Sequence, residues 1–335
     1  MNTSRRKADL HVHSSESHDV PEFPRYAPRK LFEYALGHPR LDRRMDFFAL
    51  TDHETMSGYE KLMRELPEAD RALVIPGVEH ALLDPAIGFT IHVNLYGLHP
   101  DQYARVGERI RTLEELADFC RLEGIRMLYN HPTWWEQAEI RAGQVELAKV
   151  RDAIEYFDVM ELNAGRTRLM NEISENIALA NGKHLIANSD THTGDVGRAY
   201  TEAAGETPAE FLDNLWSGRC EPHPYHMTSQ SILGMVHAAI DELFSHQQGI
   251  YIKPSAMDSG HPRIESLARR LLSSQHVMGH RPFRAPLRLL MRQVARLGVW
   301  RFLEHERALE RSLRSSDLFM FEDAPVDPSM PASVG

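Results

Sequence analysis

The chain has 335 residues, of which 42% are hydrophobic and 26% are charged, and these proportions exclude a disordered or fibrous protein. The formal net charge of −10 argues against general nucleic-acid binding, and no apolar run is long enough to span a membrane. The polar start lacks the apolar stretch of a signal peptide, and Cys120 and Cys220 form no CxxC pair, so we expect a cytoplasmic protein with free thiols.

Seven short apolar runs predict β-strands in the first two-thirds of the chain. They are Ala8–Val12, Phe47–Leu50, Leu73–Pro76, Thr90–Tyr96, Arg126–Tyr129, Val159–Leu162 and His184–Ala187. Apolar residues at helical spacing predict helices between them, at Pro28–Leu36, Thr112–Glu123 and Arg168–Asn181. Strands that alternate with helices are typical of parallel βαβ units, and this number of strands favours a TIM-like barrel over an open sheet.

The pattern changes near Tyr225, after which strand signals are rare. Helices are expected at Ser231–Phe244, Pro262–Ser274 and Pro286–Leu313, with a loop at Gly249–Gly260. Residues 261–314 include twelve arginines and four glutamates, a balance of +8 in a chain whose net charge is −10. We therefore expect an α/β domain over residues 1–225 and a basic, mainly helical extension over 226–335, with a frayed tail at Asp323–Gly335.

Within this extension, arginines recur every four residues along one predicted helix, at Arg284, Arg288, Arg292 and Arg296. Apolar residues take the opposite side, at Leu287, Leu290, Met291, Val294 and Leu297. The simpler interpretation is a helix that packs on the barrel through its apolar side and exposes a solvated basic face. The alternative is a surface that binds an anionic partner, whether nucleic acid, an acidic protein or an anionic lipid.

The 19 histidines are the unusual feature of the composition, because neutral imidazole is the commonest ligand of transition metals. A histidine or an acidic residue follows nearly every predicted strand, which is where a parallel barrel carries its functional side chains. His11 and His13 are two residues apart on a strand, so their side chains share one face. His92 lies inside an apolar alternation, where a histidine buried in the core is the alternative. The recurrence predicts a metal site.

Four ordered motifs carry a resemblance to a known family. They are His11-x-His13 after Asp9, Thr51-Asp52-His53, Asn130-His131-Pro132 and Ser189-Asp190-Thr191-His192. Over about residues 8–225, this set resembles the PHP (polymerase and histidinol phosphatase) family of metal-dependent phosphoesterases. The resemblance implies a distorted, TIM-like (β/α)7 barrel with a trinuclear metal site.

The resemblance also implies which residues bind the metals. The first metal would be held by His11, His13, Glu79 and Asp190, the second by Glu79, His92 and His131, and the third by His18, His53 and His192. Glu79 would bridge the first two metals. Position 18 departs from the commoner family pattern, because His18 is followed by Asp19 and either residue could be the ligand. We favour His18.

Nitrogen and oxygen ligands without a thiolate suit two to three divalent ions of Zn, Mn or Fe. Water held between two metals that Glu79 bridges would lose a proton near neutral pH, and the metal-bridging hydroxide would attack a phosphate ester. We therefore expect a phosphoric ester hydrolase whose substrate is a phosphorylated small molecule or nucleotide. The same site could cleave an amide or a lactone, and a non-catalytic PHP module that binds a partner is the third interpretation.

A few further residues are candidates for substrate binding or catalysis. Arg166 and Arg198 follow ligand-bearing strands and would match phosphate oxygens, although a solvent-exposed loop arginine is the alternative for each. Trp134 could stack on a flat leaving group, or it could pack the loop together with Trp135. Asp52 is a candidate orienter or proton donor, with a helix N-cap role as the alternative.

Overall fold

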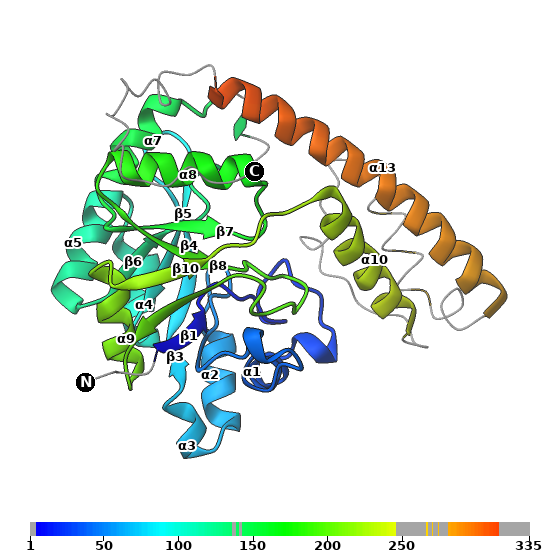
Figure 1. The fold of residues 1–335 in the computed structure, drawn as a ribbon, viewed down its shortest axis with the longest axis horizontal. Coiled ribbons are helices and arrows are strands. Elements are labelled where there is room, and N and C mark those ends of the chain that lie inside the picture. Colours follow the sequence, from blue (N-terminus) through cyan, green and yellow to red (C-terminus); the bar gives the residue numbers. More distant parts are fainter. Residues whose placement is uncertain are drawn as a thin grey trace, which may run out of the picture.

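The computed structural model describes residues 5–135, 139–140, 143–245 and 281–314, together with residues 266, 270 and 274. It consists of a mixed α/β body and two long helices, α10 (Ser229–Ser245) and α13 (Arg281–Arg314), which lie beside that body (Figure 1). The α/β class and the helical C-terminal region agree with the sequence prediction. The predicted loop Gly249–Gly260, most of the predicted helix Pro262–Ser274 and the tail Asp323–Gly335 lie outside the described residues.

The first sheet has five strands in the order β10-β9-β1-β2-β3. Their bounds are β1 (Arg5–Asp9), β2 (Phe47–Ala49), β3 (Val74–Ile75), β9 (Tyr200–Ala204) and β10 (Cys220–His223). β1, β2 and β3 are parallel, whereas β9 runs antiparallel to both β1 and β10. Ala8 of β1 pairs with Phe47 of β2, and both are buried in one cluster with Phe211 of helix α9 (Pro208–Trp216). This burial holds the first strand against the body.

The second sheet also has five strands, in the order β4-β5-β6-β7-β8. Their bounds are β4 (Gly77–Leu83), β5 (Thr90–Tyr96), β6 (Arg126–Tyr129), β7 (Val159–Asn163) and β8 (His184–Asn188). β4, β5 and β6 pair antiparallel, and β6, β7 and β8 pair parallel. Ile91, Val93 and Leu95 alternate along β5 and are buried in the largest apolar cluster. Alternation therefore directs the intervening residues of β5 to the other face of the sheet.

A closed barrel of parallel strands is not what the structure shows, so this part of the predicted fold needs correction. The strands form two separate sheets, which meet at isolated parallel bridges between Val12 and Thr191 and between His53 and Glu79. Only a short connection, with no helix, separates β4 from β5. A parallel pair needs a crossover of a dozen or more residues, so this connection makes the pair antiparallel.

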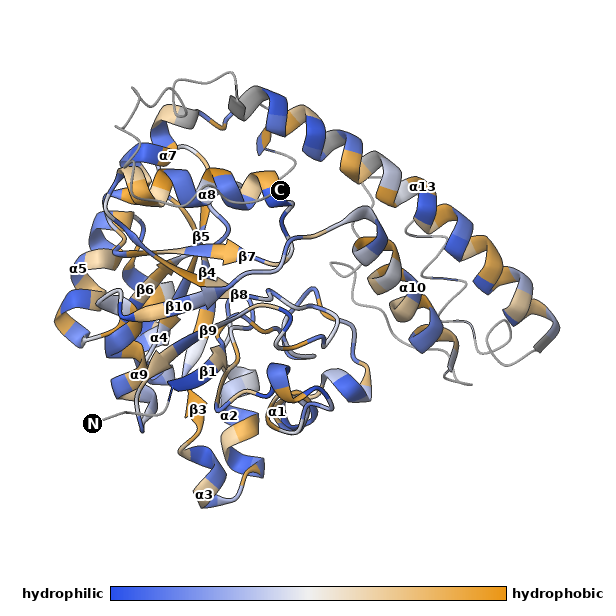
Figure 2. Ribbon diagram, viewed as in Figure 1, coloured by the Kyte–Doolittle hydropathy of each residue, from blue (hydrophilic) through white to orange (hydrophobic). Residues whose placement is uncertain are grey.

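Helices surround the strands of the body (Figure 1). In addition to α9 they are α1 (Pro28–Leu36), α2 (Ser57–Glu65), α3 (Glu68–Arg71), α4 (Pro100–Arg109), α5 (Leu113–Glu123), α7 (Leu147–Ile154) and α8 (Arg168–Ala180), with 3-10 turns at Pro24–Tyr26 and Leu41–Arg43. Local signals explain the ends of α5: Thr112 and Glu115 form a capping box, and Gly124 ends the helix with a φ of 72°. Both strands and helices of the body contain apolar as well as polar segments (Figure 2).

The C-terminal helices differ in two respects from the prediction. α10 packs on α13 and on the segment that contains Phe23 and Tyr26, through a cluster that includes Leu287 and Met291. The other predicted packing residues of α13, namely Leu290, Val294 and Leu297, are exposed. Two of the arginines expected in solvent, Arg288 and Arg292, instead pair with Asp241 of α10. α10 therefore contacts α13 along the boundary between the arginine side and the apolar side of α13. No helix among the described residues is long and apolar enough to cross a bilayer.

Candidate metal centre

A cavity of about 570 Å³ opens where the ends of strands from both sheets meet. Its walls are formed mainly by histidines and carboxylates, and α13 contributes one side chain. The lining residues are His18, Asp19, His53, Glu54, Ala81, His92, His131, Trp134, Gly165, Arg166, Asp190, His192 and Phe302. Six of the nine predicted metal ligands therefore line one cavity, and the other three lie directly behind its wall, as described next.

The buried carboxylate of Glu79 is shared between two sets of histidines. Its Oε2 atom lies 2.9 Å from Nε2 of His11 and 3.2 Å from Nε2 of His13. Its Oε1 atom lies 2.9 Å from Nδ1 of His92 and 3.3 Å from Nε2 of His131. Burial alone would raise the pKa of Glu79, but the surrounding histidines, above all His53 and His11, hold it well below its usual range. Glu79 is therefore negatively charged, and each of its two carboxylate oxygens faces one set of histidines.

Asp190 completes the first set. Its Oδ1 atom lies 3.3 Å from Nε2 of His11 and 3.2 Å from Nε2 of His13. One ligand atom from each of His11, His13, Glu79 and Asp190 falls within 4.8 Å of the others. The predicted first group of ligands is thus brought together.

His92 belongs to the site and not to the apolar core. It takes one of the positions of β5 whose neighbours, Ile91 and Val93, face the core. With His53 and Glu79 it forms a second compact group, in which the ligand atoms again lie within 4.8 Å of one another. His131 joins this group through Glu79.

The third group contains Asp19 where His18 was predicted. Oδ2 of Asp19 lies 2.8 Å from Nε2 of His192 and 3.4 Å from Nε2 of His53, and the compact group consists of His13, Asp19, His53 and His192. The exposed His18 lies at the cavity wall with its ring 5.2 Å from that of His53. Of the two candidates left open by the sequence, Asp19 has the better geometry for binding a cation here, because its carboxylate faces His53 and His192.

The ion pair between Asp19 and His192 dominates the electrostatics of the third group. Burial would lower the pKa of His192, but the ion pair with Asp19 and the nearby Asp190 raise it to about 10. Burial would raise the pKa of Asp19, but His192 and His53 outweigh the effect of burial and lower this pKa. The carboxylate thus carries a charge that either a proton on His192 or a bound cation can balance.

The donor set fits divalent metals. Three groups of nitrogen and oxygen atoms converge, each compact enough for one ion, and neighbouring groups share His13, His53 and Glu79. Imidazole and carboxylate without thiolate are ligands that Zn, Mn and Fe accept.

Glu161 contacts the ring nitrogen of His11 opposite the one that faces Glu79. Its buried carboxylate lies 2.8 Å from Nδ1 of His11 and accepts hydrogen bonds from the side chains of Asn163 and Asn188 and from the backbone N–H of His131. A carboxylate on the far nitrogen of a ligand histidine fixes the ring's orientation and tautomer. Its place inside the apolar run Val159–Leu162 was the only sequence signal for this role.

The backbone is constrained at the same strand ends. Among the described residues, the non-glycine positions with positive φ are Glu54 at 56°, His131 at 26° and Asp190 at 50°. All three line the cavity. Residues other than glycine rarely adopt such angles, and surrounding structure must hold them there, as is typical of functional sites.

Asp52 lies behind the ligands. Its buried carboxylate accepts hydrogen bonds from the backbone N–H and the hydroxyl of Ser14, at 2.5 and 2.7 Å. It thereby anchors the segment that follows His13. The N-cap alternative is wrong, because α2 is preceded by Met56 and has no side-chain cap.

The residues predicted to contact substrate fall in different places. Arg166 is only 3% exposed, so it is no solvent-exposed loop residue, and it lines the cavity. Its guanidinium lies 3.0 Å from Glu306 of α13 and donates to the carbonyl of Thr133. Trp134 lies at the cavity, 5.0 Å from the ring of His92. Trp135, by contrast, is buried in the core.

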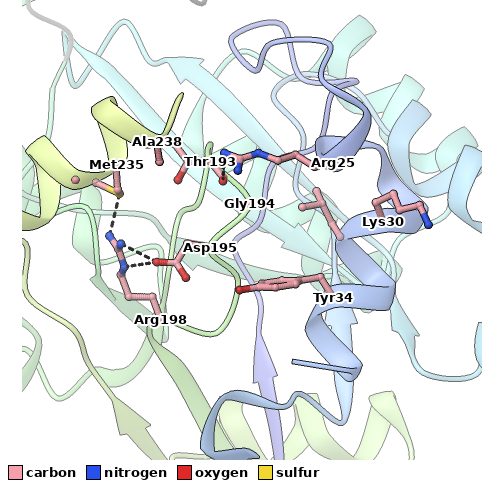
Figure 3. Close-up of a pocket in the computed structure, with 11 residues that line it drawn as sticks. Arg25, Lys30, Tyr34, Thr193, Gly194, Asp195, Arg198, Met235 and Ala238 are labelled. Atoms are coloured by element: carbon pink, nitrogen blue, oxygen red, sulfur yellow. Dashed lines mark hydrogen bonds and ion pairs between the residues drawn. The ribbon is translucent and has the colours of Figure 1, made fainter. Parts of the chain in front are cut away.

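Arg198 lies in a neighbouring cavity of about 510 Å³ between the loop after β8 and α10 (Figure 3). It is paired with Asp195 at 2.7 Å, and another of its nitrogens faces the thioether sulfur of Met235, a weak acceptor. Arg25 and Lys30 lie on the opposite side of this cavity. A smaller cavity shares His192 with the histidine-lined cavity and Arg198 with the second one.

Comparisons with known proteins found related structures. A two-domain protein from Bacteroides vulgatus, described as containing a predicted PHP-like metal-dependent phosphoesterase, is 16% identical with a TM-score of 0.45, over 67% of this chain and 66% of that one. PsfC from Pseudomonas syringae is 19% identical with a TM-score of 0.48, over 72% and 100%. An amidohydrolase from Chromobacterium violaceum is 15% identical with a TM-score of 0.43, over 64% and 97%. This chain thus spans just under two-thirds of the Bacteroides protein. No curated protein sequence matches it.

A family model described as PHP-associated matches residues 168–220. This segment begins with α8 and includes the fourth motif, Ser189-Asp190-Thr191-His192. The match falls on part of the chain for which the ordered motifs predicted the same family. Over residues 168–220 the chain is therefore similar to the PHP-associated family, in agreement with the resemblance that its motifs carry.

Proposed function

We propose that the protein is a metal-dependent phosphoesterase that hydrolyses a phosphate ester of a small metabolite or nucleotide. The observation that carries this proposal is the position of Glu79, whose two oxygens face separate sets of histidines at the base of a cavity with an arginine in its wall. Under this proposal residues 1–225 form the hydrolase domain and residues 226–335 an extension that contributes to the cavity wall.

Two to three divalent ions of Zn, Mn or Fe would be held by His11, His13, Asp19, His53, Glu79, His92, His131, Asp190 and His192. When bound, they would lower the pKa of a coordinated water and neutralise charge on a phosphoryl group. Glu161 would keep the ring of His11 oriented, and Asp52 would hold the segment that carries the first ligands.

Arg166 is the residue best placed to bind the phosphoryl group. Its Nε atom is buried and has no hydrogen-bond partner among the described residues, while the rest of the guanidinium is held by Glu306 and Thr133. A buried donor without a partner is costly, and a substrate oxygen would satisfy it. Glu306 is then a positioning residue, because it acts through Arg166.

Trp134 and Arg198 would contact the part of the substrate that leaves. Trp134 offers a ring beside His92 and His131, on which a flat group could stack. Arg198 lines the smaller cavity beside His192 and would meet a distal polar or anionic group. The substrate proposed is accordingly longer than the phosphoryl group alone.

The test combines metal analysis with a panel of substrates. The purified full-length chain should contain two to three divalent metals and hydrolyse phosphate esters, including nucleotides with 3′ or 5′ phosphates. Hydrolysis of amides or lactones with no turnover of any phosphate ester would replace the proposal with the amide or lactone alternative. Metal binding without turnover of either panel would favour the non-catalytic interpretation.

Matched variants show whether turnover comes from this site. Glu79→Ala and His53→Ala should abolish it, whereas His99→Ala, which changes an exposed histidine on the N-terminal side of α4, should not. Equal activity in all three variants would assign the turnover to a contaminant.

A further inference from the structure

The outward face of α13 is apolar. Phe283, Leu289, Leu290, Val294, Leu297 and Trp300 are each more than half exposed. Leu290, Val294 and Leu297 follow the spacing of a single helix face, and Phe283 lies on the same face two turns earlier. Together these four side chains form the apolar stripe of α13. Contiguous exposed apolar surface on a helix usually marks a binding surface.

The same helix segment is strongly basic. Between Arg281 and Arg301 the sequence has six arginines and no acidic residue, in a chain whose net charge is −10. Apolar and polar segments alternate along the coloured part of α13 (Figure 2). Arg288 and Arg292 share the single carboxylate of Asp241, which leaves this pair with a surplus positive charge. Arg296 is exposed and contacts Gln293.

We propose that this segment of α13 docks on the surface of an anionic lipid bilayer, with the apolar stripe inserted among the acyl chains and the arginines at the headgroups. Leucine and phenylalanine on one face with arginines on the other are typical of helices that lie in this interface. The interaction needs no membrane-spanning helix.

Charge decides between the possible occupants of the stripe. A second copy of the chain would bring another helix with six arginines and no acid over the same segment, so two such helices would repel each other. An anionic surface offers opposite charge at every position along the helix. The net negative charge of the body is screened over about 8 Å at physiological salt, so the local charge of the helix dominates contact.

The test is sedimentation of the full-length chain with vesicles of phosphatidylcholine, alone or mixed with phosphatidylserine. We expect the protein to sediment with the mixed vesicles and to bind those of phosphatidylcholine alone at least about tenfold more weakly. Raised salt should reduce binding to the mixed vesicles. The triple variant Leu290→Glu, Val294→Glu, Leu297→Glu should lose binding by at least about tenfold, because each change places a negative charge in the stripe.

A matched control makes the same chemical change elsewhere. Leu122→Glu replaces an 86% exposed leucine at the other side of the molecule, on α5, and should bind vesicles like the unchanged chain. Arg296→Gln is a milder change that should weaken binding to mixed vesicles only. Circular dichroism and metal content of each variant show whether it is folded.

Three results would overturn the proposal. They are no sedimentation with mixed vesicles, equal sedimentation of the triple variant and the Leu122→Glu control, or a dimer in solution that the triple variant dissociates while vesicles bind neither form. The last result would assign the stripe to a second copy of the chain. None of them depends on turnover at the metal centre.

Discussion

The buried ion pair between Arg166 and Glu306 is the main polar link between α13 and the cavity, and its removal should have a large effect. Both side chains are 4% exposed and their charged atoms lie 3.0 Å apart. Glu306→Gln leaves the Arg166 guanidinium buried without a counter-charge, which typically costs about 3–5 kcal/mol. In a domain of more than 200 residues 1 kcal/mol shifts Tm by about 2 °C, so we expect Tm to fall by roughly 6–10 °C.

Thermal denaturation of the full-length chain, followed by circular dichroism, measures this change. Glu304→Gln is the matched control, since Glu304 is exposed two residues earlier on the same helix, and it should change stability by less than about 0.5 kcal/mol. The double variant Arg166→Met, Glu306→Leu removes both charges and should recover much of the loss. Equal Tm values for Glu306→Gln and Glu304→Gln, or a double variant as unstable as the sum of its single changes, would refute the reasoning.

Three further predictions concern the metal centre and the thiols. Glu79→Gln should lower turnover by about 10³-fold or more and reduce the metal content measured by elemental analysis, and retention of both would exclude the bridging role. Asp19→Asn should weaken metal binding by at least about tenfold while His18→Ala changes it less, and the reverse order in a chelator competition would restore His18 as the ligand. Burial raises the pKa of Cys120 to about 12, so at pH 8 only about one thiol in 10⁴ is ionised. A thiol reagent should therefore modify the partly exposed Cys220 first and Cys120 only after unfolding; rapid reaction of both would contradict this order.

Much of the α/β body could be predicted from hydrophobic patterns. The structure has β5 at Thr90–Tyr96 and β6 at Arg126–Tyr129, where their apolar runs predicted them. β9 and β10 were missed because their sequences, YTEAA and CEPH, lack an apolar run. β10 is the edge strand of its sheet, and the buried residues of its neighbour β9, Thr201 and Ala203, are small and only weakly apolar, so neither strand shows an apolar run.

The convergence of the candidate ligands could be predicted, because side chains at strand ends meet whatever the pairing of the strands. The choice between His18 and Asp19 could not, since both fall in a turn where adjacent side chains point in different directions. The packing of α13 was predicted only in part for a related reason: Leu287 and Met291 are packed, whereas Leu290, Val294 and Leu297 are exposed. An amphipathic pattern shows that a helix has an apolar side, but it does not show that the protein's own core covers that side.

The contact between His11 and Asp190 joins residues about 180 positions apart in the chain, at the first and last of the four motifs. A metal bound by both would be a cross-link that closes most of the α/β body into a loop. In the chain-entropy model of cross-links, a loop of this length lowers the entropy of the unfolded state by the equivalent of about 5 kcal/mol. Under this model, metal binding would raise the free energy of unfolding and the resistance to proteolysis, in addition to any role in turnover.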